Sequence, residues 1–159
     1  MKKLKLYLDT SVISHLKQDD VPDKMADTLQ LWEEIKAGLY EVVISDVTLE
    51  EISRCTPEKR SILYNYLSEI EYTTIHGNPE IIKVADLIID MGILRPKSYD
   101  DCMHIASAVL AECDYILSWN FKHMVNVKTI NGVRAISLLH RYKQVEIIQP
   151  TMLIEHKEE

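Results

Sequence analysis

The chain has 159 residues and a mass of 18.4 kDa, a length that predicts one domain with its own hydrophobic core. Its hydrophobic fraction of 47% and charged fraction of 27% are those of a soluble globular protein, which excludes a disordered or fibrous chain. With 25 acidic and 18 basic residues the net charge is −7, whereas a protein that binds nucleic acid by neutralising phosphates usually carries the opposite balance. If nucleic acid is the partner, something other than the overall composition must supply positive charge.

Cysteine usage and short apolar runs predict a cytoplasmic protein. Cys55, Cys102 and Cys113 are odd in number and form no CxxC pair, so we expect neither a disulfide framework nor a structural zinc site. No apolar run approaches the roughly 20 residues that a membrane helix needs. The Met-Lys-Lys start leads into a short strand-like run without an apolar signal segment, so we expect neither secretion nor association with a membrane.

Short β-branched runs alternate with helical patterns along the chain. In chain order we predict a strand at 5–8, a helix from about 12, a helix between 22 and 38, a strand at 40–44, helices at 45–54 and 57–70, a strand at 72–75, helices at 79–91 and 98–112, a strand at 115–118, a helix at 132–142 and an edge strand at 145–148. This alternation predicts an α/β fold of three layers (α/β/α), with helices on both faces of a central, mostly parallel sheet of about five strands. We expect a single domain over 1–159, with its core at about 4–148 and a C-terminal tail at about 151–159.

Oxygen-bearing side chains follow the predicted strands. In parallel sheets, ligands bind beyond the carboxyl ends of the strands, where the strand order reverses. The residues at or near these ends are Asp9, Thr10, Ser11, Ser45, Asp46, Glu50, Glu51, Ser118 and Asn120, and Asp100 and Asp101 open the helix at 98–112. Carboxylates that converge on one pocket repel one another unless protonation or a metal ion removes the repulsion. Oxygen ligands of this kind suit Mg²⁺ or Mn²⁺.

Each of these residues also has a purely structural interpretation. Asp9 has the position of a helix N-cap, and Asp100 and Asp101 lie in a first helical turn, where the helix dipole favours acidic residues. Glu50 or Glu51 would suit a solvated helix face, and Asn is common in turns. The individual residues therefore do not decide between structure and chemistry.

Four strings in chain order are more informative. Leu8-Asp9-Thr10-Ser11 resembles the first motif of PIN-domain nucleases, and Ser45-Asp46-Val47-Thr48-Leu49-Glu50-Glu51 resembles their second, Ser-x-x-Thr-x-x-Glu, which selects Glu51 over Glu50. Asp101-Cys102-Met103-His104-Ile105-Ala106-Ser107-Ala108 is similar to the third motif, and Ser118-Trp119-Asn120 to the fourth. The resemblance covers the chain from Leu4 to about Ile148. Among PIN domains, the chain is similar to the VapC-type ribonuclease toxins of type II toxin–antitoxin modules.

The resemblance implies metal-dependent hydrolysis of RNA phosphodiester bonds. Asp9, Glu51, Asp101 and Asn120 would be the catalytic and metal-binding residues for one or two Mg²⁺ or Mn²⁺ ions. Thr10, Ser11 and Ser118 would orient the carboxylates, and Lys122, with His123, Arg54, Arg95 and Lys97, would be available to phosphates. Asn120 stands where many family members have Asp, which leaves the number of ions open, and Ser118 replaces the usual Thr.

The resemblance also implies partners: an RNA substrate, an antitoxin protein and a second copy of the chain in a homodimer. Two other functions stay open, a catalytically weak PIN scaffold that binds or regulates, and a Mg²⁺-dependent phosphatase of small phosphate esters. A dehalogenase-type phosphatase would need an acid where Ser11 stands, and a receiver domain would need a Lys after the strand at 115–118. His104 is interpreted as a packed histidine in preference to a ligand, and Trp119 as packed in preference to stacking on a base.

This interpretation explains how a protein with a net charge of −7 could bind nucleic acid. Bound divalent ions would supply the positive charge that the composition lacks. We therefore expect RNA affinity to depend on the metal, and not on a broad basic face, and we expect the remaining acidity to suit a basic partner peptide.

Overall fold

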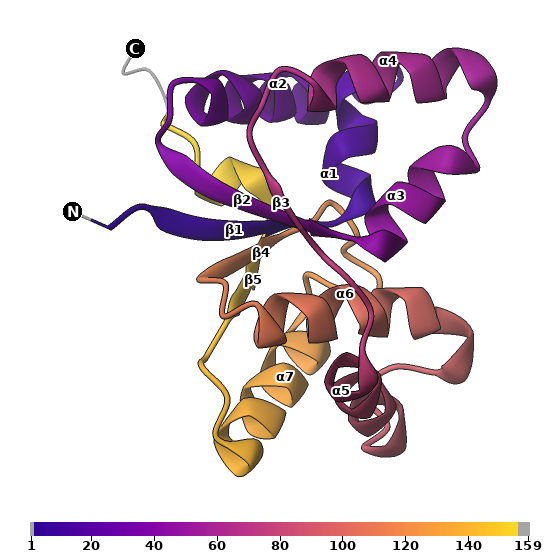
Figure 1. The fold of residues 1–159 in the computed structure, drawn as a ribbon, viewed down its shortest axis with the longest axis vertical. Helices are drawn as coiled ribbons and strands as arrows, with labels where there is room; N and C mark the ends of the chain where they lie inside the picture. Colours follow the sequence, from indigo (N-terminus) through magenta and orange to yellow (C-terminus); the bar gives the residue numbers. More distant parts are fainter. Residues whose placement is uncertain (1, 156–159) are drawn as a thin grey trace.

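The protein is described by a computed structural model covering residues 2–155, so the predicted tail residues 156–159 lie outside the described residues. Its centre is a five-stranded sheet in the order β3-β2-β1-β4-β5, and all four strand pairs are parallel (Figure 1). The strands are β1 (Leu4–Leu8), β2 (Tyr40–Ser45), β3 (Thr73–Ile75), β4 (Tyr115–Leu117) and β5 (Glu146–Ile148). The predicted parallel sheet of about five strands is confirmed, with β5 at one edge.

Helices cover both faces of this sheet, so the predicted three-layer arrangement is also confirmed. One face carries α1 (Thr10–Ser14), α2 (Pro22–Lys36), α3 (Asp46–Ser53) and α4 (Pro57–Leu67), and the other carries α5 (Pro79–Asp90), α6 (Tyr99–Leu110) and α7 (Val127–His140) (Figure 1). Short 3₁₀ helices lie at His15–Lys17, Pro96–Ser98 and Pro150–Met152. In the described part of the chain, no helix is long and apolar enough to cross a membrane.

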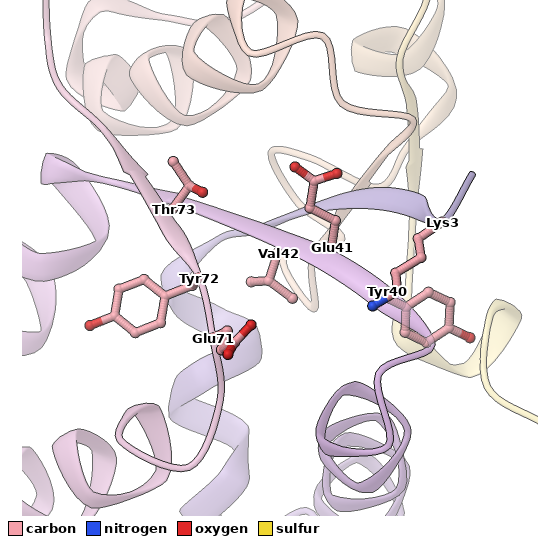
Figure 2. Close-up of a pocket in the computed structure, with 7 residues that line it drawn as sticks. All are labelled: Lys3, Tyr40, Glu41, Val42, Glu71, Tyr72 and Thr73. Carbon is pink, nitrogen blue, oxygen red and sulfur yellow. The ribbon is translucent and has the colours of Figure 1, made fainter. Parts of the chain in front are cut away.

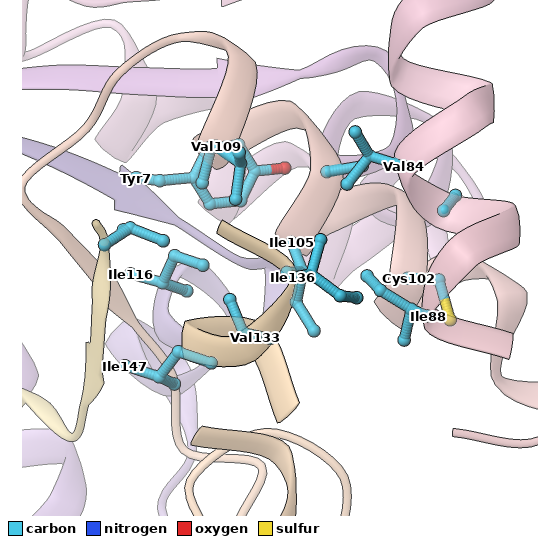
Figure 3. Close-up of a cluster of buried hydrophobic side chains, with 14 of the residues drawn as sticks. Tyr7, Val84, Ile88, Cys102, Ile105, Val109, Ile116, Val133, Ile136 and Ile147 are labelled. Atoms are coloured by element: carbon cyan, nitrogen blue, oxygen red, sulfur yellow. The ribbon is translucent and has the colours of Figure 1, made fainter. Parts of the chain in front are cut away.

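Two hydrophobic cores result because successive side chains of a strand point to opposite faces. Leu6 and Leu8 of β1 pack with α1, α2 and α4, whereas Tyr7 packs with α5 and α6 on the other face. Figure 3 shows the second core, in which Tyr7 and Ile116 of the sheet meet helix residues such as Ile105. The burial of β1 on both faces is typical of the central strand of a parallel sheet.

Local signals explain where several helices begin. Pro57 and Pro79 occupy first helical positions, where a missing N–H costs nothing. Each is preceded by a cap: the Thr56 side chain accepts a hydrogen bond from the N–H of Lys59, and Asn78 caps α5 in the same way. The helices predicted at 57–70 and 98–112 are present but end earlier, at Leu67 and Leu110.

The predicted start of the last helix is wrong by five residues. We expected the helix at 132–142, but α7 begins at Val127, after an Asn126 cap that accepts a hydrogen bond from the N–H of Thr129. Gly132 therefore lies inside the helix. A Cβ atom at this position would lie 2.5 Å from Cγ1 of Ile93, so the glycine permits close packing and does not mark the start of the helix.

The chain end beyond the sheet is held against α2 as far as residue 155. The Thr151 hydroxyl donates to the Asp27 carboxylate at 2.7 Å, and the backbone N–H of Glu155 donates to Glu34 at 3.1 Å. Ile154 is buried in the core beneath α2. The first part of the expected tail thus packs on the domain.

The strand order reverses next to β1. The chain runs from β1 to β2 and β3 on one side, and β4 and β5 lie on the other. At this point the N–H of Asp9, just after β1, donates to the carbonyl of Leu117, at the end of β4, over 3.3 Å. The carboxyl ends of β1 and β4 therefore form the crevice where a doubly wound sheet usually binds its ligand.

Candidate active site

All four predicted catalytic residues come from elements that end or begin at the carboxyl edge of the sheet. Asp9 follows β1 and caps α1, and Glu51 lies in α3, directly after β2. Asp101 lies in the first turn of α6, and Asn120 is three residues beyond β4. The topology thus brings to one edge residues that are up to 111 positions apart in sequence.

Asp9 is buried and held by two serine hydroxyls. Its Oδ1 atom accepts hydrogen bonds from Ser11 Oγ at 2.5 Å and from the N–H of Val12 at 3.2 Å, and its Oδ2 atom accepts one from Ser118 Oγ at 2.5 Å. Burial raises the pKa of Asp9, although His104 and the serine hydroxyls act in the opposite direction. Both serines therefore make the contacts that an orienting role requires.

The serine hydroxyls are themselves held by the loop after β4. Ser11 Oγ accepts a hydrogen bond from the N–H of Trp119 at 2.8 Å, and Ser118 Oγ accepts one from the N–H of Asn120 at 2.9 Å. Each hydroxyl thus accepts a hydrogen bond from a backbone N–H and donates a hydrogen bond to Asp9. Both oxygens of the Asp9 carboxylate therefore accept hydrogen bonds.

Glu51 faces the site, whereas Glu50 is exposed. Glu51 Oε1 accepts a hydrogen bond from Thr10 Oγ1 at 2.9 Å and lies 2.6 Å from His104 Nε2. Burial raises the pKa of Glu51, but the hydrogen bond and charge of His104, with help from Thr10, outweigh it and lower the pKa overall. Glu51 is therefore ionised, and the motif spacing selected the glutamate that points into the site.

Asp101 and Asn120 meet through a histidine. Asp101 Oδ2 lies 3.0 Å from Nδ1 of His123, and Asn120 Oδ1 accepts the backbone N–H of His123 at 3.0 Å. Burial raises the pKa of Asp101, His123 and His104 oppose this shift, and the negative charge of Glu51 adds to it. Asn120 thus positions the turn that carries His123, which sequence reasoning considered only as a phosphate contact.

His104 is the site residue whose role the sequence did not indicate. It is packed as expected, with 1% of its surface exposed, yet both ring nitrogens have polar partners. Nδ1 lies 2.6 Å from the hydroxyl of Tyr7, and Nε2 contacts Glu51. Burial lowers the pKa of His104, but Tyr7, Glu51 and Asp9 outweigh it and raise the pKa to about 10. A buried positive charge therefore lies between the carboxylates.

Two further candidates are now placed. Trp119 is buried, and its indole N–H donates to Thr28 Oγ1 at 2.9 Å, so it packs against α2 and offers no free face to a base. Lys122 is exposed, and it lines a cavity together with His123.

The only sign in the sequence that could have suggested a role for His104 is its spacing of three residues from Asp101, which places the two on neighbouring helix positions.

No family model and no curated protein matches the sequence, but solved structures do match the fold. VapBC2 from Rickettsia felis, bound to a DNA fragment from its promoter, aligns with a TM-score of 0.56 and 15% identity over 92% of this chain and 98% of that chain. VapBC-1 from nontypeable Haemophilus influenzae aligns with a TM-score of 0.56 and 16% identity over 93% of this chain and 99% of that chain. The chain has a PIN fold of the VapC type. The fold that the four motifs implied is confirmed, and the chemistry must be argued from the site itself.

The PIN fold brings the carboxylates to one edge without joining them into a ready cluster. Within residues 2–155, no group of three or more His, Cys, Asp or Glu side chains is arranged so that it could hold a metal ion. Each carboxylate points instead to a histidine or to hydroxyl groups. The elements that carry the carboxylates end or begin at one edge, but these side chains, all within the described residues, share no contacts, so the gathered acidic pocket stays a prediction.

Two carboxylates nevertheless retain an oxygen for a ligand. In the described part of the chain, Oε2 of Glu51 and Oδ1 of Asp101 make no hydrogen bond, and 31% and 22% of these side chains are exposed. Mg²⁺ usually keeps several waters and binds proteins through one or two carboxylates. Glu51 and Asp101 therefore each leave one oxygen, on a partly exposed side chain, that would suit a hydrated divalent ion.

A cavity elsewhere in the PIN domain is unrelated to this site. It has a volume of about 460 Å³ and lies at the amino ends of the strands, between Lys3, Tyr40 and Tyr72 (Figure 2). None of the predicted site residues lines it. Because ligands of such sheets bind at the opposite, carboxyl edge, we assign no chemistry to this cavity.

Proposed function

We propose that the protein is a metal-dependent endoribonuclease and the toxin component of a toxin–antitoxin pair. The observation that carries the proposal is the arrangement of Glu51 and Asp101 in a VapC-type PIN fold. Each has one oxygen without a hydrogen bond, and burial, together with repulsion from the charge of Glu51, raises the pKa of Asp101. A bound divalent cation would relieve this repulsion, which is what a site built for such an ion requires.

The ligands of one or two Mg²⁺ or Mn²⁺ ions would be Asp9, Glu51, Asp101 and Asn120. Such an ion lowers the pKa of a bound water and stabilises charge on the phosphate oxygens. The other residues of the chain hold the ligands in place: Ser11 and Ser118 orient Asp9, Thr10 and His104 orient Glu51, and His123 orients Asp101. Of the four, Asp9 has both oxygens engaged in hydrogen bonds from the serines and the backbone, so it would hold an ion through a bridging water.

The proposed partner is an antitoxin with a basic segment. Both structural neighbours are VapBC assemblies. In this chain, Asp46, Glu50 and Asp100 line a cavity of about 230 Å³. These acids already pair with His76 and Arg54, and the cavity suits a further basic side chain. A homodimer is proposed as well: on α4, Tyr64 is exposed and available to an interface, whereas Tyr66 is partly buried against the core.

The proposal predicts that neighbouring acids in the sequence differ sharply in importance. Glu51→Gln and Asp101→Asn should each lower RNA cleavage in Mn²⁺ by at least roughly 100-fold, because each removes a charged ligand. The matched controls Glu50→Gln and Asp100→Asn remove the same charge one residue earlier, from exposed side chains, and should keep activity within about threefold. Cleavage of a labelled single-stranded RNA, followed on gels with and without EDTA, measures both.

Three outcomes would count against this function. If the wild-type protein does not cleave RNA with either ion, the chain is a binding scaffold. That outcome would agree with the hydrogen bonds that every site carboxylate makes within the chain. If all variants cleave equally, the activity comes from elsewhere. If only small phosphate esters are hydrolysed, the protein is a phosphatase.

A further inference from the structure

A basic cavity adjoins the proposed active site. It has a volume of about 340 Å³ and is lined by Arg95 and Lys97 from the segment before α6, by Lys122 and His123 from the loop after β4, and by Lys128 from the first turn of α7. The volume lies within the roughly 300–1,000 Å³ typical of ligand pockets. Two stretches of the chain, 93–98 and 122–129, therefore build one concave positive surface.

The positive charges of this cavity are not neutralised by the protein. No acidic side chain is among the residues that line it. Within residues 2–155, the side chains of Arg95, Lys97, Lys122 and Lys128 make no ion pair, whereas Lys143 and Arg134 elsewhere pair with acids at 2.7 and 2.6 Å. In a chain with a net charge of −7, four unpaired cations around one cavity repel one another, and an anion would relieve that repulsion.

The cavity is joined to the acidic site by one residue. His123 lines the cavity, and its ring Nδ1 lies 3.0 Å from Asp101. A chain bound at Asp101 would therefore meet positive charge as it leaves the site on this side. The start of α7 adds to that charge, because the amino end of a helix carries a partial positive charge.

We propose that this cavity binds the phosphate backbone of the RNA segment that flanks the scissile bond. The inference rests on the proposed nuclease function. A polyanion is favoured over a single anion because four cationic side chains from two stretches of the chain line one cavity. Buried Ile93 and Leu94 also line it and form its apolar part.

This inference refines the expectation that RNA binding depends on the metal alone. The protein has no excess of basic residues overall, but it concentrates four of them where the substrate would leave the acidic site. RNA affinity should therefore have a component that survives removal of divalent ions. That component should depend on salt, because each phosphate contact releases counterions.

The test measures binding in EDTA, where the proposed cleavage cannot occur. A labelled 12-nucleotide single-stranded RNA is titrated with wild-type protein, with the Lys97→Ala/Lys128→Ala variant, and with Lys3→Ala/Lys83→Ala as a control of equal charge. All four lysines are exposed, and thermal unfolding checks that both variants are folded. We expect the cavity variant to lose roughly 5- to 20-fold in affinity and about 1.4 in the slope of log K against log salt, and the control to stay within about twofold.

The outcomes separate this inference from the proposed function. If the two double variants bind RNA equally, only total charge matters and the cavity is not a binding site. If the cavity variant keeps RNA affinity but loses affinity for poly-glutamate, the occupant is an acidic protein, which also overturns the inference. If the cavity variant loses RNA affinity while the wild-type protein shows no cleavage in Mn²⁺, the cavity binds RNA and the nuclease proposal alone has failed.

Discussion

At the scale of single residues, the site is organised by groups that hold the carboxylates. His104 shows this most clearly, since one nitrogen contacts Tyr7 in the middle of the sheet and the other contacts Glu51. The Tyr7 hydroxyl also forms a hydrogen bond of 2.7 Å with Ser45 Oγ, at the end of β2. A buried charge costs several kcal/mol unless it is paired and hydrogen-bonded, and here the partners are present on both sides of the ring.

The first prediction concerns the pH dependence that His104 gives to stability. Its pKa in the folded state, about 10, lies above the ordinary value of about 6.5. The resulting stabilisation is fully present below about pH 6.5 and is lost as the pH rises towards 10. His104→Gln should therefore be less stable than wild type at pH 6, by about 3 kcal/mol, and this difference should shrink by pH 9.5.

Urea unfolding of both proteins at several pH values measures this effect. His140→Gln, at an exposed position on α7, is the control and should track the wild type throughout. A difference between wild type and His104→Gln that stays constant with pH would mean that His104 is neutral in the folded protein.

At the scale of elements, the sequence predicts helices and strands better than it predicts where they meet. The parallel alternation and the order of polar residues after the strands were enough to place the candidate site at one edge of the sheet. The start of α7 was missed because Gly132 looks like a boundary when its neighbour Ile93, 39 positions earlier, is not known to approach it. A glycine required by packing and a glycine that ends a helix have the same sequence signature.

The second prediction follows from that contact. At an exposed helical position, Gly132→Ala would stabilise by up to about 1 kcal/mol. Here the new methyl group would lie 2.5 Å from Ile93 Cγ1, and such overpacking costs about 1–3 kcal/mol, so we expect net destabilisation. Equilibrium unfolding in urea of Gly132→Ala, Ile93→Ala and the double variant should show that the effects are not additive, with the double variant more stable than their sum by at least about 1 kcal/mol. A stabilising Gly132→Ala would show that α7 can move away from Ile93.

At the scale of the whole molecule, the sequence did not predict contacts between residues that lie far apart along the chain. The resemblance to PIN-domain motifs selects Glu51 over Glu50 and Asp101 over Asp100, because each motif fixes the position of its carboxylate relative to neighbouring residues. The motifs do not show that Ser118 donates to Asp9, 109 positions away, or that His104 carries charge into the site. The sequence named Arg95, Lys97, Lys122 and His123 as available to phosphates, but only the fold shows that these side chains line one cavity together with Lys128.

The last prediction uses the cost of holding negative charge at one edge of the molecule. Burial and the charge of Glu51 raise the pKa of Asp101, so its ionised form is less favourable in the folded protein than in the unfolded chain. Above that pKa the ionised carboxylate lowers stability, and neutral Asn removes this effect. In EDTA at pH 7.5, Asp101→Asn should therefore unfold at a higher temperature than wild type, while Asp100→Asn, at an exposed position, should match wild type.

Adding Mn²⁺ should reverse this order. An ion that binds only the folded state stabilises by about 2.7 kcal/mol at 100 times its Kd, and a ligand set without Asp101 gains less. Wild type and Asp100→Asn should then unfold at higher temperatures than Asp101→Asn, as measured by thermal unfolding at matched ionic strength. If Mn²⁺ shifts all three proteins equally, the ion does not bind at Asp101. If Asp101→Asn is less stable than wild type in EDTA as well, the pairing of Asp101 with His123 contributes more to the fold than its repulsion from Glu51 removes.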